Sequence, residues 1–138
     1  DYMIILGIDI SKKQLDVALI KEGKLQNKIF TNCSQGFNQL DIWVKKCGDI
    51  EIFACMEATG FYGELLAEFL YSKGYNVSIV NPFCIKAYAQ SKLSRHKTDK
   101  KDSSIIAEYA LYQNPRLWKP YNHNSKELRV FSSTKSSA

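Results

Sequence analysis

The chain has 138 residues, 45% of them hydrophobic, which is enough for one domain with a real core and too little for a second full domain. No apolar run approaches the roughly 18 residues of a membrane span, so we expect no membrane partner. The net charge of +5 is uneven, with −2 on residues 1–80 and +7 on residues 81–138, which makes the second part a candidate surface for a polyanion.

The first thirty residues are predicted to form three antiparallel strands. Residues 3–10 are apolar and β-branched, as in a buried central strand. Residues 15–21 alternate between the two faces of a strand, with Asp16 on the less apolar face. A tight turn at residues 22–24 leads into a third strand at residues 25–31.

The middle of the chain is predicted to alternate helices and strands. Apolar spacings of three and four indicate a helix over residues 37–47, and short apolar runs indicate strands at residues 51–56 and 76–80. Between these strands, residues 61–72 are predicted to be helical. The expected core face of that helix consists of Leu65, Leu66, Phe69 and Leu70. This order predicts an α/β fold in which right-handed parallel crossovers extend the meander into a mixed five-stranded sheet flanked by helices.

Two further helices are predicted around a basic stretch. The first runs from residue 83 to about residue 90, and the basic stretch covers residues 92–101. The second helix is predicted from Thr98 or Asp99 to Tyr112, before Asn114-Pro115.

The four cysteines indicate neither a zinc site nor a set of disulfides. None forms a Cys-x-x-Cys pair, and two lie in apolar surroundings. We therefore expect reduced thiols, as in a cytoplasmic protein.

Four carboxylates are candidates for a metal site. Asp9 and Glu57 each lie at the end of a predicted strand, where a charge is costly unless it is paired or bound to a metal. Asp99 and Asp102 are three residues apart, on one face of the last predicted helix. Phosphodiester chemistry commonly uses two Mg²⁺ roughly 3.5–4 Å apart, held by a few hard oxygen ligands.

Each of these acids also has a structural interpretation. Asp9 can be satisfied by backbone donors at a strand end, and Glu57 can cap the helix that follows it. Asp99 and Asp102 match a helix start, where acidic side chains complement the helix dipole. The combination favours a cation, because four like charges brought together repel one another.

Four short segments together resemble a known family. They are Gly7-Ile8-Asp9-Ile10-Ser11-Lys12, Met56-Glu57-Ala58-Thr59-Gly60, Val80-Asn81-Pro82 and Lys97-Thr98-Asp99-Lys100-Lys101-Asp102-Ser103. Their order and spacing are similar to those of the N-terminal domain of the DEDD insertion-sequence transposases, a group related to the Piv DNA invertase. The similarity runs from Met3 to about Tyr112 and extends toward Arg129.

The resemblance implies an RNase H-like (RuvC-like) domain with a metal site. Asp9, Glu57, Asp99 and Asp102 match the four family carboxylates that bind divalent metal, and we expect them to bind two Mg²⁺, with Mn²⁺ as a substitute. It also implies a recombinase that uses a structured guide RNA to pair donor and target DNA, and that forms a homo-oligomer when full-length.

The family also carries a second domain with a nucleophilic serine, and we expect that domain to be absent here. Residues 3–121 are expected to form the DEDD catalytic domain. Residues 122–138 are expected to be a linker and the start of a truncated or disordered extension, as the polar tail indicates.

Basic side chains precede the last two carboxylates and are candidate contacts for nucleic-acid phosphates. They are Lys86, Lys92, Arg95, His96, Lys97, Lys100 and Lys101. We interpret His96 as a phosphate contact rather than a catalytic residue. Nearby tyrosine and tryptophan side chains are interpreted as core or domain contacts in preference to base-stacking residues.

Two alternative functions remain open on the sequence. A hydrolytic nuclease of the Holliday-junction type would use the same carboxylates with a metal-bound water. A non-catalytic RNA-binding module would use the fold only as a scaffold. Unchanged metal binding and function after Asp9→Asn would favour the scaffold.

Overall fold

The computed structural model of the chain describes residues 3–48, 50–58, 60–93 and 101–120. Its centre is a mixed five-stranded sheet with the strand order β3-β2-β1-β4-β5. The predicted mixed sheet is therefore confirmed, and β1 is its central strand.

One side of the sheet is an antiparallel meander of β1 (Met3–Ile10), β2 (Gln14–Lys21) and β3 (Lys24–Thr31). The turn between β2 and β3 has positive φ at both Glu22 and Gly23, as a type I′ hairpin turn requires. On the other side of β1, β4 (Glu51–Glu57) and β5 (Asn76–Val80) add as parallel strands. These strands follow the order predicted from the sequence.

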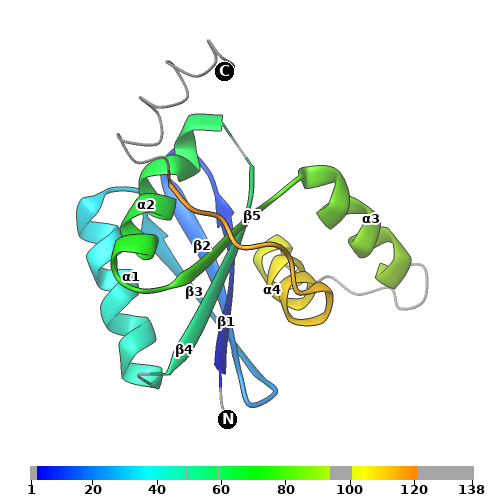
Figure 1. The fold of residues 1–138 in the computed structure, drawn as a ribbon, viewed down its shortest axis with the longest axis horizontal. Helices are drawn as coiled ribbons and strands as arrows, with labels where there is room; N and C mark the ends of the chain where they lie inside the picture. The colour runs from blue at the N-terminus through cyan, green and yellow to red at the C-terminus, as the bar shows by residue number, and fades with distance from the viewer. Residues whose placement is uncertain (1–2, 49, 59, 94–100, 121–138) are drawn as a thin grey trace, which may run out of the picture.

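Helices cover both faces of the sheet (Figure 1). α1 (Ser34–Cys47) and α2 (Glu64–Ser72) lie on one face, and a short 3-10 helix, η1 (Gly60–Gly63), precedes α2. α3 (Pro82–Leu93) and α4 (Asp102–Gln113) lie on the opposite side. None of the helices in the described ranges is long and apolar enough to cross a bilayer.

Two apolar cores lie on the two faces of the sheet. Along β1, Ile4 and Ile8 are fully buried in the larger core with residues of α1 and α2. Ile5, on the other face, belongs to the smaller core with Ile106 and Ala107 of α4. Because side chains alternate along a strand, the odd-numbered side chains of β1 face α4. This alternation decides where the acidic side chains of the sheet lie.

The predicted core face of α2 is wrong at one position. Leu65 is 69% exposed, whereas Leu66, Ala67 and Leu70 are buried. The 3-10 helix occupies Gly60–Gly63, the α-helix begins at Glu64, and its buried stripe includes Ala67 instead of Leu65.

The predicted start of the last helix is also wrong. α4 begins at Asp102 and not at Thr98 or Asp99, because Lys101 has an extended backbone with φ −65° and ψ 152°. Asp99 lies before the first residue of α4 and outside the described residues. The prediction that Asp99 and Asp102 lie on one face of this helix is therefore not supported.

After α4 the chain returns to the edge of β5. The backbone N–H of Trp118 donates a hydrogen bond of 2.7 Å to the carbonyl of Val77. The Trp118 ring meets Tyr71 edge to face, which agrees with a packing role for this aromatic residue. The predicted linker and extension at residues 122–138 lie outside the described residues.

Candidate metal site

Asp9 and Glu57 lie next to each other at the ends of two parallel strands. In the ladder between β1 and β4, Ile8 is paired with Met56, so Asp9 and Glu57 occupy the next position on each strand. Ile8 and Met56 face the larger core, and both acids therefore face the α4 side of the sheet. Both acidic residues are partly buried. The parallel pairing thus brings together two carboxylates 48 positions apart in the sequence.

Asp102 reaches the same place because α4 lies directly on β1. At Gly7, a built Cβ would lie 2.2 Å from both the Ala107 nitrogen and the Ser103 carbonyl oxygen, so the two backbones meet where β1 has no side chain. The face of α4 that approaches β1 carries the small buried residues Ser103 and Ala107. Asp102, the first residue of α4, is exposed at the end of this contact.

Burial and neighbouring acidic charges raise the pKa of two acids of this site, Asp9 and Glu57. Burial, and then the charges of Asp102 and Asp16, raise the pKa of Asp9 above its usual value. Burial, and then the charges of Asp9 and Asp102, raise the pKa of Glu57. Asp9, Glu57 and Asp102 therefore lie close enough for their charges to interact. Without a cation, the ionised carboxylates are unfavourable there.

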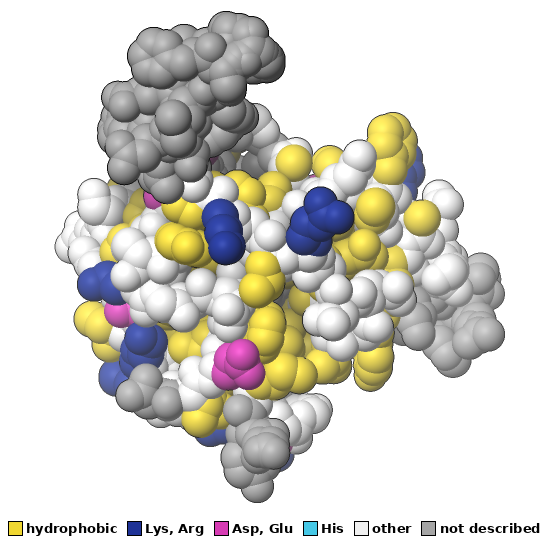
Figure 2. Space-filling view, viewed as in Figure 1, with side chains coloured by type: hydrophobic (Ala, Val, Ile, Leu, Met, Phe, Trp, Pro, Cys, Tyr) yellow, Lys and Arg dark blue, Asp and Glu magenta, His cyan; other side chains and the backbone are white. Residues whose placement is uncertain are grey.

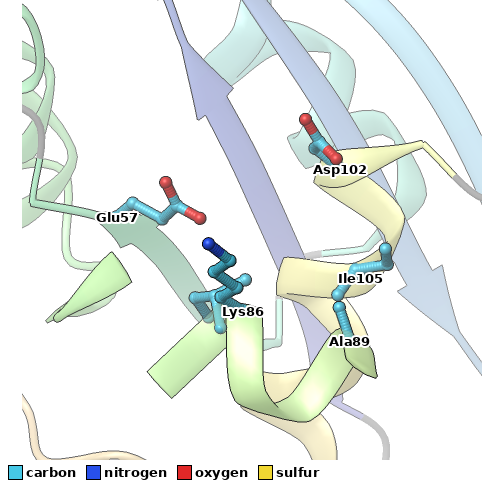
Figure 3. A pocket seen from close by; sticks show the side chains of 6 residues that line it. Glu57, Lys86, Ala89, Asp102 and Ile105 are labelled. Atoms are coloured by element: carbon cyan, nitrogen blue, oxygen red, sulfur yellow. The ribbon is translucent and has the colours of Figure 1, made fainter. Parts of the chain in front are cut away.

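A pocket of about 200 Å³ opens between Glu57 and Asp102. Its other lining residues come from α3 and α4 and are Ile85, Lys86, Ala89 and Ile105. Figure 3 shows the Lys86 ammonium pointing from α3 toward the Glu57 carboxylate, with Asp102 across the pocket at the start of α4. One liquid water occupies about 30 Å³, so the pocket has room for an ion with several waters.

One acidic neighbour was missed by the sequence analysis. Asp16 on β2 is paired directly with Asp9 in the antiparallel ladder, and its charge raises the pKa of Asp9. The signal was available, because a hairpin that pairs Ile10 with Leu15 must also pair Asp9 with Asp16. The alternation of residues 15–21 by itself places Asp16 only on the less apolar face of its strand.

Only part of the predicted basic surface falls within the described residues. Lys86 lines the pocket, and the Lys101 ammonium lies 3.8 Å from Asp16. The side chain of Lys92 and all of Arg95, His96, Lys97 and Lys100 lie outside what the structure describes. In the view of Figure 2, the Lys and Arg side chains near the centre stand apart, with apolar or neutral surface between them.

The donor chemistry of the site fits a hard divalent cation. Asp9, Glu57 and Asp102 supply carboxylate oxygens, the ligands that Mg²⁺ prefers. No group of three or more Asp, Glu, His or Cys side chains in the described ranges is already arranged to hold a metal ion. The fourth predicted ligand, Asp99, lies outside those ranges.

The fold is RNase H-like. A solved structure of RuvC from T. thermophilus in complex with a Holliday junction substrate aligns with a TM-score of 0.54, covering 84% of this chain and 99% of that chain. The two sequences are 12% identical, so the likeness is one of fold.

The sequence profile of the IS110-type DEDD transposases, described as "Transposase", matches residues 6–138, and the chain belongs to this family. The pilin gene-inverting proteins of Moraxella bovis and Moraxella lacunata are each 42% identical to it over 125 residues. The alignments cover 89% of this chain and 39% of each relative, so the chain spans about two fifths of the length of these curated relatives.

Proposed function

We propose that this chain is the catalytic domain of a metal-dependent DNA recombinase, in which Asp9, Glu57, Asp99 and Asp102 hold two Mg²⁺. The observation that carries the proposal is geometric: the register of β1 and β4 sets Asp9 beside Glu57 at the ends of two parallel strands, and Asp102 lines the same pocket as Glu57. Mn²⁺ is the expected substitute, because it accepts the same hard oxygen ligands.

Asp9 is proposed as the central ligand of the site. It occupies the central strand, between β2 and β4, and it lowers the tendency of Glu57 to ionise. When bound, divalent ions of this kind neutralise the scissile phosphate and activate the attacking oxygen. Glu57 and Asp102 would supply ligands from the two sides of the pocket that they line.

Lys86 is proposed to hold a phosphate of the nucleic-acid backbone beside the acids. Its ammonium group points into the pocket rather than away from it (Figure 3). The same role is proposed for Lys92, Arg95, His96, Lys97, Lys100 and Lys101. Together these side chains would offset the negative charge of the carboxylates for an approaching polyanion.

The relatives are longer than this chain, and a longer protein that contains this domain would carry out the complete reaction. We propose that donor and target DNA are paired by a structured guide RNA, and that a serine from a second domain attacks the DNA while the acids of this domain position the phosphate. Strand transfer and self-association would then belong to the longer protein. The DNA-inverting relatives named above support recombination as the overall outcome.

The first test is Mn²⁺ binding by the wild-type chain and by Asp9→Asn, measured by isothermal titration calorimetry. We expect the affinity of Asp9→Asn to fall at least tenfold. Glu68→Gln is the matched control, because it removes one exposed acid from α2 on the other face of the sheet. Equal Mn²⁺ affinity in Asp9→Asn and the wild type would contradict the proposal and favour a non-catalytic scaffold.

Product analysis tests the hydrolytic alternative. Branched DNA is incubated with the chain and Mg²⁺, and the ends that form are identified. Cleavage to free 3′-hydroxyl and 5′-phosphate ends by this chain, abolished in Asp9→Asn, would favour a hydrolytic nuclease. Metal binding without such cleavage agrees with a domain that needs the serine of the longer protein.

A further inference from the structure

Asp16 has a set of contacts that the proposed metal site does not explain. Its Oδ1 accepts hydrogen bonds from the Ser103 hydroxyl at 3.1 Å and from the Asn27 amide at 3.2 Å. Its Oδ2 lies 3.8 Å from the Lys101 ammonium. One carboxylate on β2 therefore contacts the residues on both sides of Asp102.

The Asn27 side chain from β3 completes this arrangement. Its Nδ2 donates to the Ser103 hydroxyl at 3.1 Å and to the backbone carbonyl of Val17 at 3.1 Å, besides Asp16. Ser103 is completely buried, so its hydroxyl depends on these protein partners. Asp16, Asn27 and Ser103 form a network that ties β2 and β3 to the first turn of α4.

This network acts at a point where α4 has no capping side chain of its own. Lys101, the N-cap residue, makes no side-chain cap hydrogen bond. The close contact at Gly7 brings the backbone of α4 against β1 at Ser103 and Ala107, and side-chain contacts join the first turn to β2 and β3. Asp16 supplies such contacts through Ser103 and Lys101.

We propose that Asp16 is a positioning residue, which holds the first turn of α4 so that Asp102 faces Asp9. This inference rests on the proposed function, because it assigns Asp102 and Asp9 to one metal site. Asp16 itself is already engaged by donors on both of its oxygens. It therefore acts through Asp102 and is not assigned as a ligand.

The test compares Asp16→Ala and Asp16→Asn in the full chain by two measurements. Amide hydrogen exchange in the metal-free protein reports on the first turn of α4, and Mn²⁺ titration reports on the site. Asp16→Ala should speed exchange in this turn several-fold while exchange in β4 and β5 stays unchanged. It should also weaken Mn²⁺ binding about 10- to 100-fold, as loss of a supporting contact typically does.

Asp16→Asn separates positioning from ligation. An asparagine keeps an oxygen that accepts the Ser103 hydrogen bond, so we expect it to retain most of the Mn²⁺ affinity and slow exchange. If Asp16→Asn instead loses as much affinity as Asp9→Asn with unchanged exchange in α4, Asp16 is a direct ligand and the proposal is wrong. Unchanged exchange and affinity in Asp16→Ala would also overturn it.

Ser103→Ala provides a second route that leaves Asp16 in place. If Asp16 acts through Ser103, the double variant Asp16→Ala/Ser103→Ala should bind Mn²⁺ about as weakly as Asp16→Ala alone. If the double variant instead loses Mn²⁺ affinity by the product of the two single-variant losses, Asp16 does not act through Ser103. Failure of the wild-type chain to bind Mn²⁺ would overturn the proposed function, and the exchange measurement would still decide whether Asp16 holds α4.

Discussion

At the scale of single residues, the ionised carboxylates of Asp9 and Glu57 lower the stability of the metal-free protein. Folding raises the pKa of Asp9 and of Glu57, so between the ordinary and the raised pKa the folded state binds more protons than the unfolded state. The free energy of unfolding that these groups contribute is therefore highest at low pH and falls as the pH rises through the raised values. The proposed binding of a cation would offset this loss of stability.

Asp9→Asn should therefore stabilise the metal-free protein at pH 7, because it removes a charge that burial and neighbouring acids disfavour. The group is partly exposed and screened, so we expect a rise in the midpoint of thermal unfolding on the order of 1–3 °C. Calorimetric scans at pH 5 and pH 7 measure it, with Glu68→Gln as control. The gain should be smaller at pH 5, and destabilisation at pH 7 would contradict this account.

Thiol reactivity offers a second check on individual residues. Burial, and then the charge of Glu57, raise the pKa of Cys55 to about 12, whereas Cys33 and Cys84 are exposed. We expect iodoacetamide at pH 8 to modify Cys33 and Cys84 in the native protein, and to modify Cys55 only after unfolding. Peptide mapping after timed labelling measures this. Rapid native labelling of Cys55 would contradict the packing of β4 under α4.

At the scale of secondary structure, the contact between β1 and α4 positions the site. The contact depends on Gly7, where any side chain would meet the backbone of α4. Gly36 has a comparable contact on the opposite face, because a Cβ there would lie 1.8 Å from the Thr31 carbonyl oxygen. The two glycines allow packing on the two faces of the sheet to be disturbed separately.

Gly7→Ala and Gly36→Ala should both lower the free energy of unfolding, by about 1–3 kcal/mol or more, because backbone atoms must move to admit the methyl group. Only Gly7→Ala displaces the helix that carries Asp102, so only this variant should weaken Mn²⁺ binding under conditions where both variants are folded. Urea unfolding and Mn²⁺ titration measure the two effects. Equal Mn²⁺ affinity in the two variants would contradict a role for the contact between β1 and α4 in the site.

The sequence predicted the order of elements because the strands and helices have clear periodic patterns. The starts of α2 and α4 were less predictable. A 3-10 helix occupies Gly60–Gly63 before α2 begins, and the acidic residues near residue 100 resemble a helix start whether or not the helix begins there. Local composition does not decide which of several candidate residues begins a helix when tertiary contacts such as those of Ser103 select one.

The candidate site was predictable in part for a similar reason. Asp9 and Glu57 could be assigned from strand ends, because parallel neighbours end at the same edge of a sheet. The contacts of Asp16 with Asn27 and Ser103 join three elements, and they depend on the exact register and on the seating of α4. Sequence spacing alone does not provide that information.

At the scale of the whole molecule, an acidic site lies within a chain whose second part is basic overall. Residues 81–138 carry a net charge of +7, and Lys86 brings one of these charges into the pocket beside Glu57. Nucleic-acid binding by this surface should depend strongly on salt, because each phosphate contact releases counterions.

Lys86→Gln should weaken binding to branched DNA with little dependence on its sequence, and should reduce the slope of log K against log salt by about one. Fluorescence anisotropy between 50 and 200 mM salt measures the slope. Lys46→Gln is the matched control, since Lys46 is exposed on α1 on the other face of the sheet. An unchanged slope in Lys86→Gln would remove this lysine from the proposed phosphate contacts.

The hairpin between β1 and β2 gives the site a constraint on chain length. Asp9 and Asp16 face each other only because residues 11–13 join the two strands in a fixed register. Deleting one residue there would turn every β2 side chain to the opposite face, bringing Leu15 beside the acids and burying Asp16 under α1. Insertions and deletions, which surface loops usually tolerate, would therefore be as damaging in this short connection as replacement of an acid itself.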